Sequence, residues 1–393
     1  MRSNYKRLGD YIREVDVRNR NLAITNLIGL SIQKKFIPSI SNTIGTDMST
    51  YRVIKTNQFA YCPVTSRNGE KITIALYDKQ EIAIISQAYN IFEIIDTRKL
   101  LPDYLMMWFC RPEFDRYARY KSHGSVREMF DWEEMCNVQL SVPSIKKQRE
   151  IVAEYQTVQK RIDLNNQLIQ KLEETAQAIY KHWFADFEFP DENGKPYKGS
   201  GSEIVDSELG EIPKGWRVGK LNEIISFNNG KVKPSTKGEY PVYGGNGIVE
   251  HVDCFNDENI IIVGRVGAYC GSLFLEKKRC WISDNAISAK PFENSIMFCF
   301  CTLQNLNLNE RSEGTGQPLI TQAILNEIDI VIPPDKVIQA FEEKISILNK
   351  NIELYVRQNS ISNELQSLFR SKMSTIEKET IKLAICPNLL KHN

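Results

Sequence analysis

Two stretches of the chain decide its fold. Residues 124–151 read GSVREMFDWEEMCNVQLSVPSIKKQREI, and residues 314–341 read GTGQPLITQAILNEIDIVIPPDKVIQAF. The second stretch repeats the apolar pattern of the first at a constant offset of 190 residues, so that Leu140 corresponds to Ile330, and both copies then reach a proline. Apolar residues two apart that end in proline predict a short strand, because proline cannot donate to a strand ladder. The chain is therefore one structural unit written twice.

A long helical pattern follows each of these prolines. In the first copy, the seam residues recur at alternating steps of four and three, which is the 3.5-residue period of a coiled coil. This seam consists of Ile151, Tyr155, Val158, Ile162, Asn165, Ile169, Leu172, Ala176, Ile179 and Trp183. The second copy keeps the rule over Phe341, Ile345, Leu348, Ile352 and Tyr355. An amphipathic helix packed on its own domain is the other interpretation, but both helices are much longer than usual, which favours a coiled coil.

The repeat predicts an α+β chain in which mixed globules alternate with long helices. Both globules contain β-type runs, for example KITIAL (71–76) and NIIIV (259–263), between loops rich in Gly, Asn and Ser. The segment between the copies is rich in Gly, Pro, Ser and acidic residues, which indicates a linker or an irregular surface segment. We expect a first globular domain at 1–143, a first long helix at 144–184, a linker at 185–215, a second globular domain at 216–333, a second long helix at 334–378 and a tail at 379–393.

Composition excludes several classes of protein. Apolar residues make up 42% of the chain and charged residues 25%, as in globular proteins. No apolar run approaches the roughly 20 residues of a membrane span, and the charged N-terminus does not resemble a signal peptide, so we expect a cytoplasmic protein. The nine cysteines are scattered without a CxxC pair, and the four histidines have no ligand spacing. We therefore expect neither a disulfide framework nor a metal site.

The plan of two dissimilar globules, each followed by a similar long helix, resembles that of type I restriction–modification specificity subunits. Individual strings also resemble this family, among them LGEIPKGW (209–216), YPVYGGNG (240–247) and SDNAI (283–287). The resemblance covers nearly the whole chain. It implies two target-recognition domains, each reading one half of a bipartite site in double-stranded DNA, in a system that defends the cell against foreign DNA. It also implies that the long helices form an antiparallel coiled coil with a pseudo-two-fold axis.

The resemblance further implies which partners the chain has. The helices would dock two modification (methyltransferase) subunits, and two restriction (motor and nuclease) subunits could join them. S-adenosylmethionine, ATP and Mg²⁺ would be bound by these partners and not by this chain. The sequence agrees with a non-catalytic role, because it contains neither a P-loop nor the Gly-rich loop of a methyltransferase core. A coiled-coil scaffold that joins two globular domains without binding nucleic acid is the alternative function.

Polar and basic loops in the globules separate these two hypotheses. Arg, Asn, Ser, Thr and Lys can contact base edges or phosphates, and Gly permits close backbone approach. In the first globule the candidates for DNA binding are Lys34, Lys35, Thr65, Ser66, Arg67, Asn68, Lys71, Ser125 and Arg127. In the second they are Tyr243, Gly244, Asn246, Arg265, Tyr269 and Gln317. A polar turn without a ligand is an equally good interpretation of several of these loops.

Two further expectations concern the helices and the charge. The residues expected to form subunit interfaces are Ile151, Val158, Ile162, Ile169, Ile179, Phe341, Leu348 and Ile352. The net charge is only +1 at pH 7. If the chain holds DNA tightly, partner subunits must therefore contribute positive surface.

Overall fold

The computed structural model describes residues 5–39, 45–66, 69, 71–123, 128–314 and 318–385. The chain divides into two compact units, and each contains one globular domain and parts of both long helices. Unit 1 comprises Met1–Leu164 and Gln358–Asn393, and unit 2 comprises Asn165–Arg357. Within the described residues, no helix combines the length and apolar character needed to cross a membrane.

The centre of unit 1 is an antiparallel sheet in the order β2-β9-β6-β7. Its strands are β2 (Ile12–Val15), β6 (Gln58–Tyr61), β7 (Ile74–Leu76) and β9 (Asn90–Ile94). Phe59 and Phe92 stack on one face with ring centroids 4.9 Å apart, and Phe109 of α1 (Pro102–Phe109) meets both rings edge-on. A second helix, α2 (Pro112–Lys121), follows. Each helix begins with a proline, whose fixed φ and missing N–H suit a first turn.

Short strand pairs complete unit 1. Ala60 and Ile91 on the other face of the sheet pack against Ile54 and Ile85. These come from the pair β5 (Arg52–Ile54) and β8 (Ala83–Ile85), beside the pair β3 (Ile28–Leu30) and β4 (Phe36–Pro38). Helix α3 (Trp132–Asn137) leads into β10 (Gln139–Ser141), which pairs with β1 (Tyr5–Arg7). The predicted strand before the first proline is therefore present.

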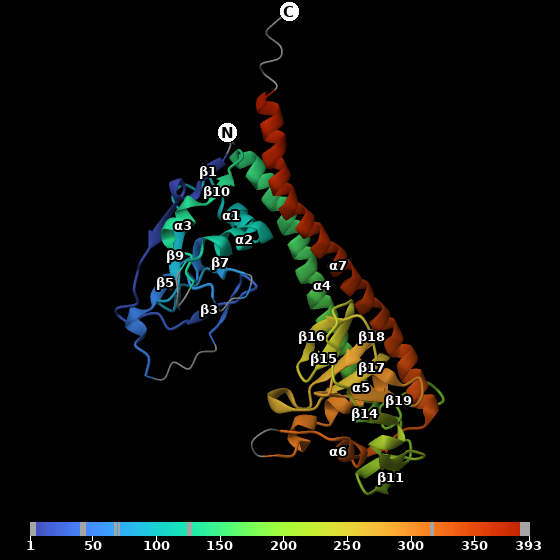
Figure 1. The fold of residues 1–393 in the computed structure, drawn as a ribbon. Helices are drawn as coiled ribbons and strands as arrows, with labels where there is room; N and C mark the ends of the chain where they lie inside the picture. Colours follow the sequence, from blue (N-terminus) through green and yellow to red (C-terminus); the bar gives the residue numbers. More distant parts are fainter. Residues whose placement is uncertain are drawn as a thin grey trace, which may run out of the picture. The chain divides into compact units, whose positions relative to one another are not determined.

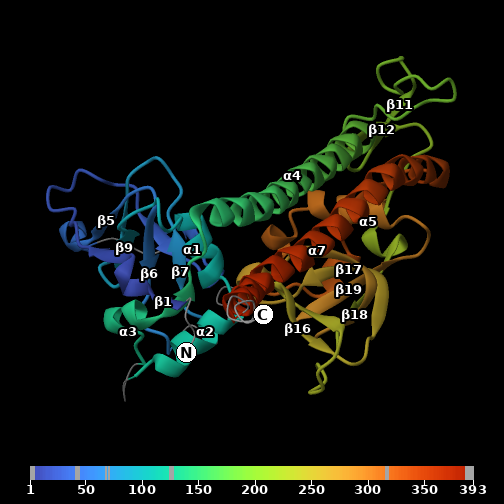
Figure 2. The ribbon, with the colours of Figure 1, turned by 90° about the horizontal axis from the view of Figure 1, so that it is seen from above.

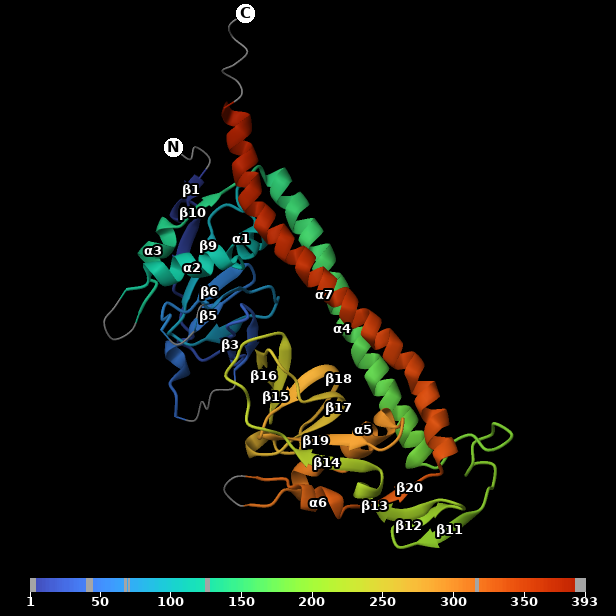
Figure 3. The same ribbon diagram turned by 45° about the vertical axis from the view of Figure 1, so that its right-hand side comes forward.

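The centre of unit 2 is a larger sheet in the order β14-β19-β17-β18-β15-β16 (Figure 3). Its strands are β14 (Ile225–Asn229), β15 (Tyr240–Gly244), β16 (Gly247–Val252), β17 (Asp257–Gly264), β18 (Leu273–Ile282) and β19 (Ala286–Pro291). Ile261 and Val263 of β17 pack with α5 (Ile296–Asn305), whereas Ile260 and Ile262 face a small cluster that contains Tyr243. This alternation follows from the two-residue period of a strand.

The two units repeat one fold. The order β2-β9-β6-β7 in unit 1 corresponds to β14-β19-β17-β18 in unit 2, and the pair β1-β10 corresponds to β13-β20. The latter strands are β13 (Arg217–Lys220) and β20 (Asp329–Ile332), and α6 (Gln322–Asn326) takes the place of α3. The Leu8 N–H donates to the Val138 carbonyl at 2.8 Å, and the Leu221 N–H donates to the Ile328 carbonyl at 2.8 Å. The predicted repeat is confirmed. The hairpin of β15 and β16 joins the unit 2 sheet through the parallel pairing of β15 with β18, whereas the hairpin of β3 and β4 at the same place in the chain order of unit 1 forms a separate pair.

The two long helices are α4 (Ile145–Phe184) and α7 (Asp335–Ile385) (Figures 1 and 2). In unit 1, the Gln366 side chain of α7 donates to Gln159 of α4 at 2.9 Å. In unit 2, the rings of Tyr180 and Trp183 near the end of α4 lie 6.0 and 5.9 Å from Phe341 near the start of α7. The start of each helix thus meets the end of the other, so they are antiparallel. Helix α7 continues past the expected end at residue 378.

The segment at 185–215 is folded and is not an open linker. It contains an antiparallel pair, β11 (Ile204–Ser207) and β12 (Gly210–Pro213). Phe189 stacks on Tyr197 at 4.6 Å and lies 5.0 Å from Trp216, and these side chains join the core of unit 2. Gly, Pro and Ser suit tight turns as well as linkers. The three aromatic residues favour a folded segment with tight turns over an open linker, because they pack into the core.

Candidate nucleic-acid interface

In unit 2, several strand ends meet at one edge of the sheet. A methyl group on Gly264, the last residue of β17, would lie 2.5 Å from the Gly245 carbonyl oxygen in the turn between β15 and β16. A methyl group on Gly245 would lie 3.3 Å from the Val266 oxygen and 3.4 Å from the Asn285 oxygen. Three loops therefore touch through their backbones. Glycine is needed at Gly264, whereas a side chain at Gly245 would fit only tightly.

Three of the predicted DNA-binding residues lie on two of these loops. Asn246 is exposed in the two-residue turn between Gly244 and Gly247, and Tyr269 is 53% exposed in the loop after β17. Arg265, which is partly buried, donates through a guanidinium N–H to the Asp284 carbonyl at 3.3 Å. The edge thus presents an amide, a phenol and part of a guanidinium, and we call this set the unit 2 edge. These groups can contact bases or phosphates.

Tyr243 and Gly244 do not belong to this exposed set, which corrects the prediction made for them. Tyr243 is 7% exposed, and its hydroxyl donates to Glu276 at 2.9 Å. Burial raises the pKa of this hydroxyl. Gly244 is buried, and a methyl group there would lie 3.1 Å from the side chain of Val249. Both residues shape the hairpin that presents Asn246.

Unit 1 builds the equivalent place with the same backbone hydrogen bonds. The Thr65 N–H donates to the Glu128 carbonyl at 3.0 Å, and the Phe130 N–H donates to Pro63 at 2.8 Å. In unit 2, the Gly267 N–H donates to Pro318 at 3.0 Å, and the Ile320 N–H donates to Arg265 at 2.9 Å. The 190-residue offset joins Glu128 to Pro318 and Phe130 to Ile320. The loop that follows Thr65 is therefore the counterpart of the loop that contains Tyr269.

The DNA-binding candidates on this unit 1 loop differ in how far they are exposed. Thr65 is fully buried and its hydroxyl lies 3.0 Å from the Ser122 hydroxyl, so it anchors the loop and does not contact DNA. Ser66 and Lys71 are exposed and stay candidates. The predictions that lie outside the described residues are Arg67, Asn68, Ser125, Arg127 and Gln317.

Lys34 also corrects a prediction, whereas Lys35 is exposed. The Lys34 ammonium donates to the Phe109 carbonyl at 2.6 Å and to the Asp115 carboxylate at 2.7 Å, and the residue is 9% exposed. An ammonium that is enclosed in this way cannot reach a phosphate. The pattern Lys34–Lys35 gave no sign of which lysine points inward.

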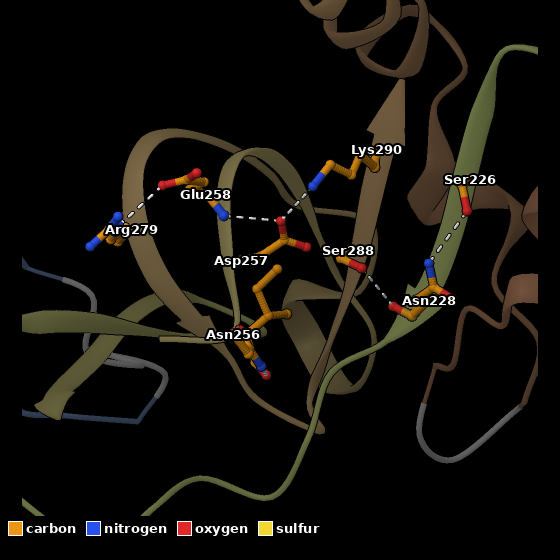
Figure 4. A network of polar contacts seen from close by, with 9 residues as sticks. Ser226, Asn228, Asn256, Asp257, Glu258, Arg279, Ser288 and Lys290 are labelled. Atoms are coloured by element: carbon orange, nitrogen blue, oxygen red, sulfur yellow. Dashed lines mark hydrogen bonds and ion pairs between the residues drawn. The ribbon is translucent and has the colours of Figure 1, made fainter. Parts of the chain in front are cut away.

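At the opposite end of the unit 2 sheet, a polar network pairs cations with carboxylates of the same network (Figure 4). Lys290 pairs with Asp257 at the start of β17 at 3.1 Å, and Arg279 pairs with Glu258 at 3.2 Å. Each cation is therefore neutralised by a neighbouring carboxylate. This end suits DNA less well than the unit 2 edge.

The seam residues of the helices are buried or half-buried within the units. Ile151 and Ile162 are 8% exposed and Phe341 is fully buried. The remaining seam residues that we predicted for subunit interfaces are half-buried, namely Val158, Ile169, Ile179, Leu348 and Ile352. Ile151, Ile162 and Phe341 are therefore buried within this chain and do not face another subunit, whereas an interface at the five half-buried residues stays a prediction.

A second apolar row on α7 faces outward. Ile347, Leu354, Ile361 and Leu368 are 63%, 50%, 57% and 57% exposed. They recur every seven residues, an interval that returns to nearly the same side of a helix. We call these four residues the outer stripe. Sequence reasoning missed it because the inner seam has a similar period, although the seven-residue spacing is readable in the sequence.

Comparison with known proteins agrees with this arrangement. Residues 213–367 match the family model described as the type I restriction modification DNA specificity domain. The type I restriction enzyme MjaIX specificity subunit of Methanocaldococcus jannaschii is 21% identical, over 77% of this chain and 77% of its own length. The HindI specificity subunit of Haemophilus influenzae is 20% identical, over 91% of this chain and 94% of its own.

A solved structure shares the fold. The crystal structure of the type I restriction–modification S subunit from M. genitalium aligns over 94% of this chain and 95% of its own, with a TM-score of 0.51 and 14% identity. Residues 213–367 match the type I restriction modification DNA specificity domain, and over most of its length the chain is similar to specificity subunits of type I restriction enzymes.

Proposed function

We propose that this chain selects DNA for its complex by reading a bipartite site, one half with the globular domain of each unit, and that it performs no chemistry itself. One observation carries the proposal: equivalent loops, anchored by equivalent backbone hydrogen bonds, occur once in each unit. Each unit thus supports its own reading loop on its own sheet. A scaffold without nucleic-acid binding has no need of such a pair.

The experiment measures a methylation profile of the assembled complex on a DNA library with both half-sites randomised. We expect Asn246→Ala to relax one half-site and Arg67→Ala to relax the other, since a lost bidentate base contact costs about 1–3 kcal/mol. Asn222→Ala is the matched control, because Asn222 is an exposed asparagine of unit 2 that precedes β14, away from the unit 2 edge. A single variant that relaxes both halves together would contradict the two-reader proposal.

We also propose that the part of the outer stripe that belongs to unit 1, Ile361 and Leu368, docks a modification subunit. Exposed apolar side chains in a heptad row are unusual on a free helix, and they fit the apolar face of a partner helix. The internal duplication suits a complex with two modification and two restriction subunits. S-adenosylmethionine, ATP and Mg²⁺ then belong to those partners, and this chain contributes sequence recognition.

A further inference from the structure

A hollow of about 820 Å³ in unit 1 lies between the start of α2 and the part of α7 that belongs to the same unit. Its charged lining consists of Lys71, Arg111, Arg116, Arg119 and Arg370, with Glu113 and Asp115. We call it the basic hollow. Cations outnumber carboxylates in its wall, so it attracts an anion.

The ion pairs of the wall leave this excess in place. Glu113 lies 3.5 Å from Arg111 and 3.7 Å from Arg116, so one carboxylate is shared by two cations. Asp115 is paired with Lys34 at 2.7 Å, and Arg119 lies 3.8 Å from Glu128. Among the described residues, Lys71 and Arg370 form no ion pair, and the Arg370 guanidinium donates to the Gln366 carbonyl at 3.3 Å.

The start of α2 adds to the positive potential. The first residue of this helix, Pro112, has no N–H, and the Phe114 and Asp115 N–H groups donate to the Arg111 carbonyl at 3.1 and 3.4 Å, so the Glu113 N–H is the group of this turn that is left for an anion. Helix N-termini favour anions through such N–H groups and the helix dipole. Arg111 itself is only 5% exposed. A guanidinium held so deeply in the wall has little freedom to lose when a ligand binds.

The basic hollow is attached to both ends of the unit 1 reading loop. Arg119 donates to the Thr65 carbonyl at 3.3 Å, where the loop begins. Lys71, in the wall, stands where the loop ends. An anion in the hollow therefore lies beside the loop for which we propose base reading.

We propose that the basic hollow binds a phosphate group of the DNA backbone next to the half-site read by unit 1. This inference rests on the proposed function and names the positioning site for it, because phosphate contacts fix register while base contacts specify. Arg370 comes from α7. The long helix thereby takes part in positioning the duplex, in addition to joining the units.

The test uses the specificity subunit assembled with its methyltransferase and a DNA duplex that contains the site. Arg370→Gln and Lys71→Gln are compared over a salt series. We expect each variant to bind on the order of tenfold more weakly at low salt. The slope of log K against log salt should fall by about 0.9 for each lost contact. Base preferences in both half-sites should stay unchanged.

Lys160→Gln is the matched control, since Lys160 is an exposed lysine of α4 in the same unit and outside the hollow. It should keep the affinity and the salt slope of the wild type. Thermal unfolding verifies that the three variants are folded. If a variant unfolds, Arg370→Lys and Lys71→Arg take its place, and a phosphate contact predicts that these retain the slope.

Two results would overturn the phosphate site. An unchanged salt slope in both Gln variants means that the hollow holds no DNA phosphate. Stabilisation of the wild type but not of Arg370→Gln by millimolar pyrophosphate or ATP, with unchanged DNA binding, means that a free phosphate compound is the ligand. The proposed function fails by a different measurement, the methylation profile of Asn246→Ala and Arg67→Ala, so the two failures are distinguishable.

Discussion

The Lys34 side chain is 6% exposed and its Asp115 partner 12%, and the same carboxylate also accepts the Ile72 N–H at 3.1 Å. The Lys34 backbone has a φ of 60°, in the left-handed region that few residues other than glycine adopt. A residue kept in this conformation needs compensation from its surroundings. Here the ion pair and the bond to the Phe109 carbonyl supply it, and they join the β3–β4 turn to α1 and α2.

We expect Lys34→Met to destabilise unit 1 by about 3 kcal/mol, because a buried carboxylate is left without its cation. The measurement is the free energy of unfolding in urea. Lys35→Met, next to it and exposed, should change this free energy by less than about 0.5 kcal/mol. In Lys34→Met combined with Asp115→Asn, part of the loss should be recovered. Equal effects of the two lysine variants would show that the ion pair does not stabilise the fold.

At the level of elements, what the sequence could predict follows from periodicity. Apolar residues two apart before Pro143 and Pro333 predicted the strands that the structure shows as β10 and β20. Apolar residues at alternating steps of four and three predicted both long helices. The exposure of individual side chains could not be predicted from this periodicity. Thr65 and Tyr243 are polar residues in loop-like strings, yet they are buried because the chain near Ser122 and Glu276 returns to contact them. Local pattern carries no information about such distant partners.

The same limit applies to the two faces of the long helices, and it gives a prediction. Ile162→Asp places a charge in the filled seam, so we expect the unfolding free energy to drop by several kcal/mol. Ile361→Asp lies on the outer stripe and should leave stability nearly unchanged, while co-purification with the modification subunit is lost. Ser360→Asp, an exposed neighbour on α7, is the control for the added charge. Normal co-purification of Ile361→Asp would rule out this part of the outer stripe as the docking face.

For the whole molecule, the balance of charge sets how DNA can be held. The chain has 50 basic and 49 acidic residues. Many of the cations are engaged internally, as Lys34, Arg279 and Lys290 show. The basic hollow is a local exception. One phosphate site and two reading loops can select a sequence, but they release few counterions, and counterion release provides much of the affinity of a DNA-binding protein.

We therefore expect the isolated chain to bind its site weakly, with a dissociation constant well above the roughly 10⁻⁸ M typical of specific DNA binders at physiological salt. Adding methyltransferase subunits should strengthen binding and steepen the salt dependence, because their cations then surround the duplex. The measurement compares fluorescence anisotropy of a labelled duplex with and without the partner, for a specific and a scrambled site. The ratio between the two sites should be set by this chain in both cases. Nanomolar, sequence-specific binding by the chain alone would mean that its own surface supplies the affinity, and that the partners are needed only for chemistry.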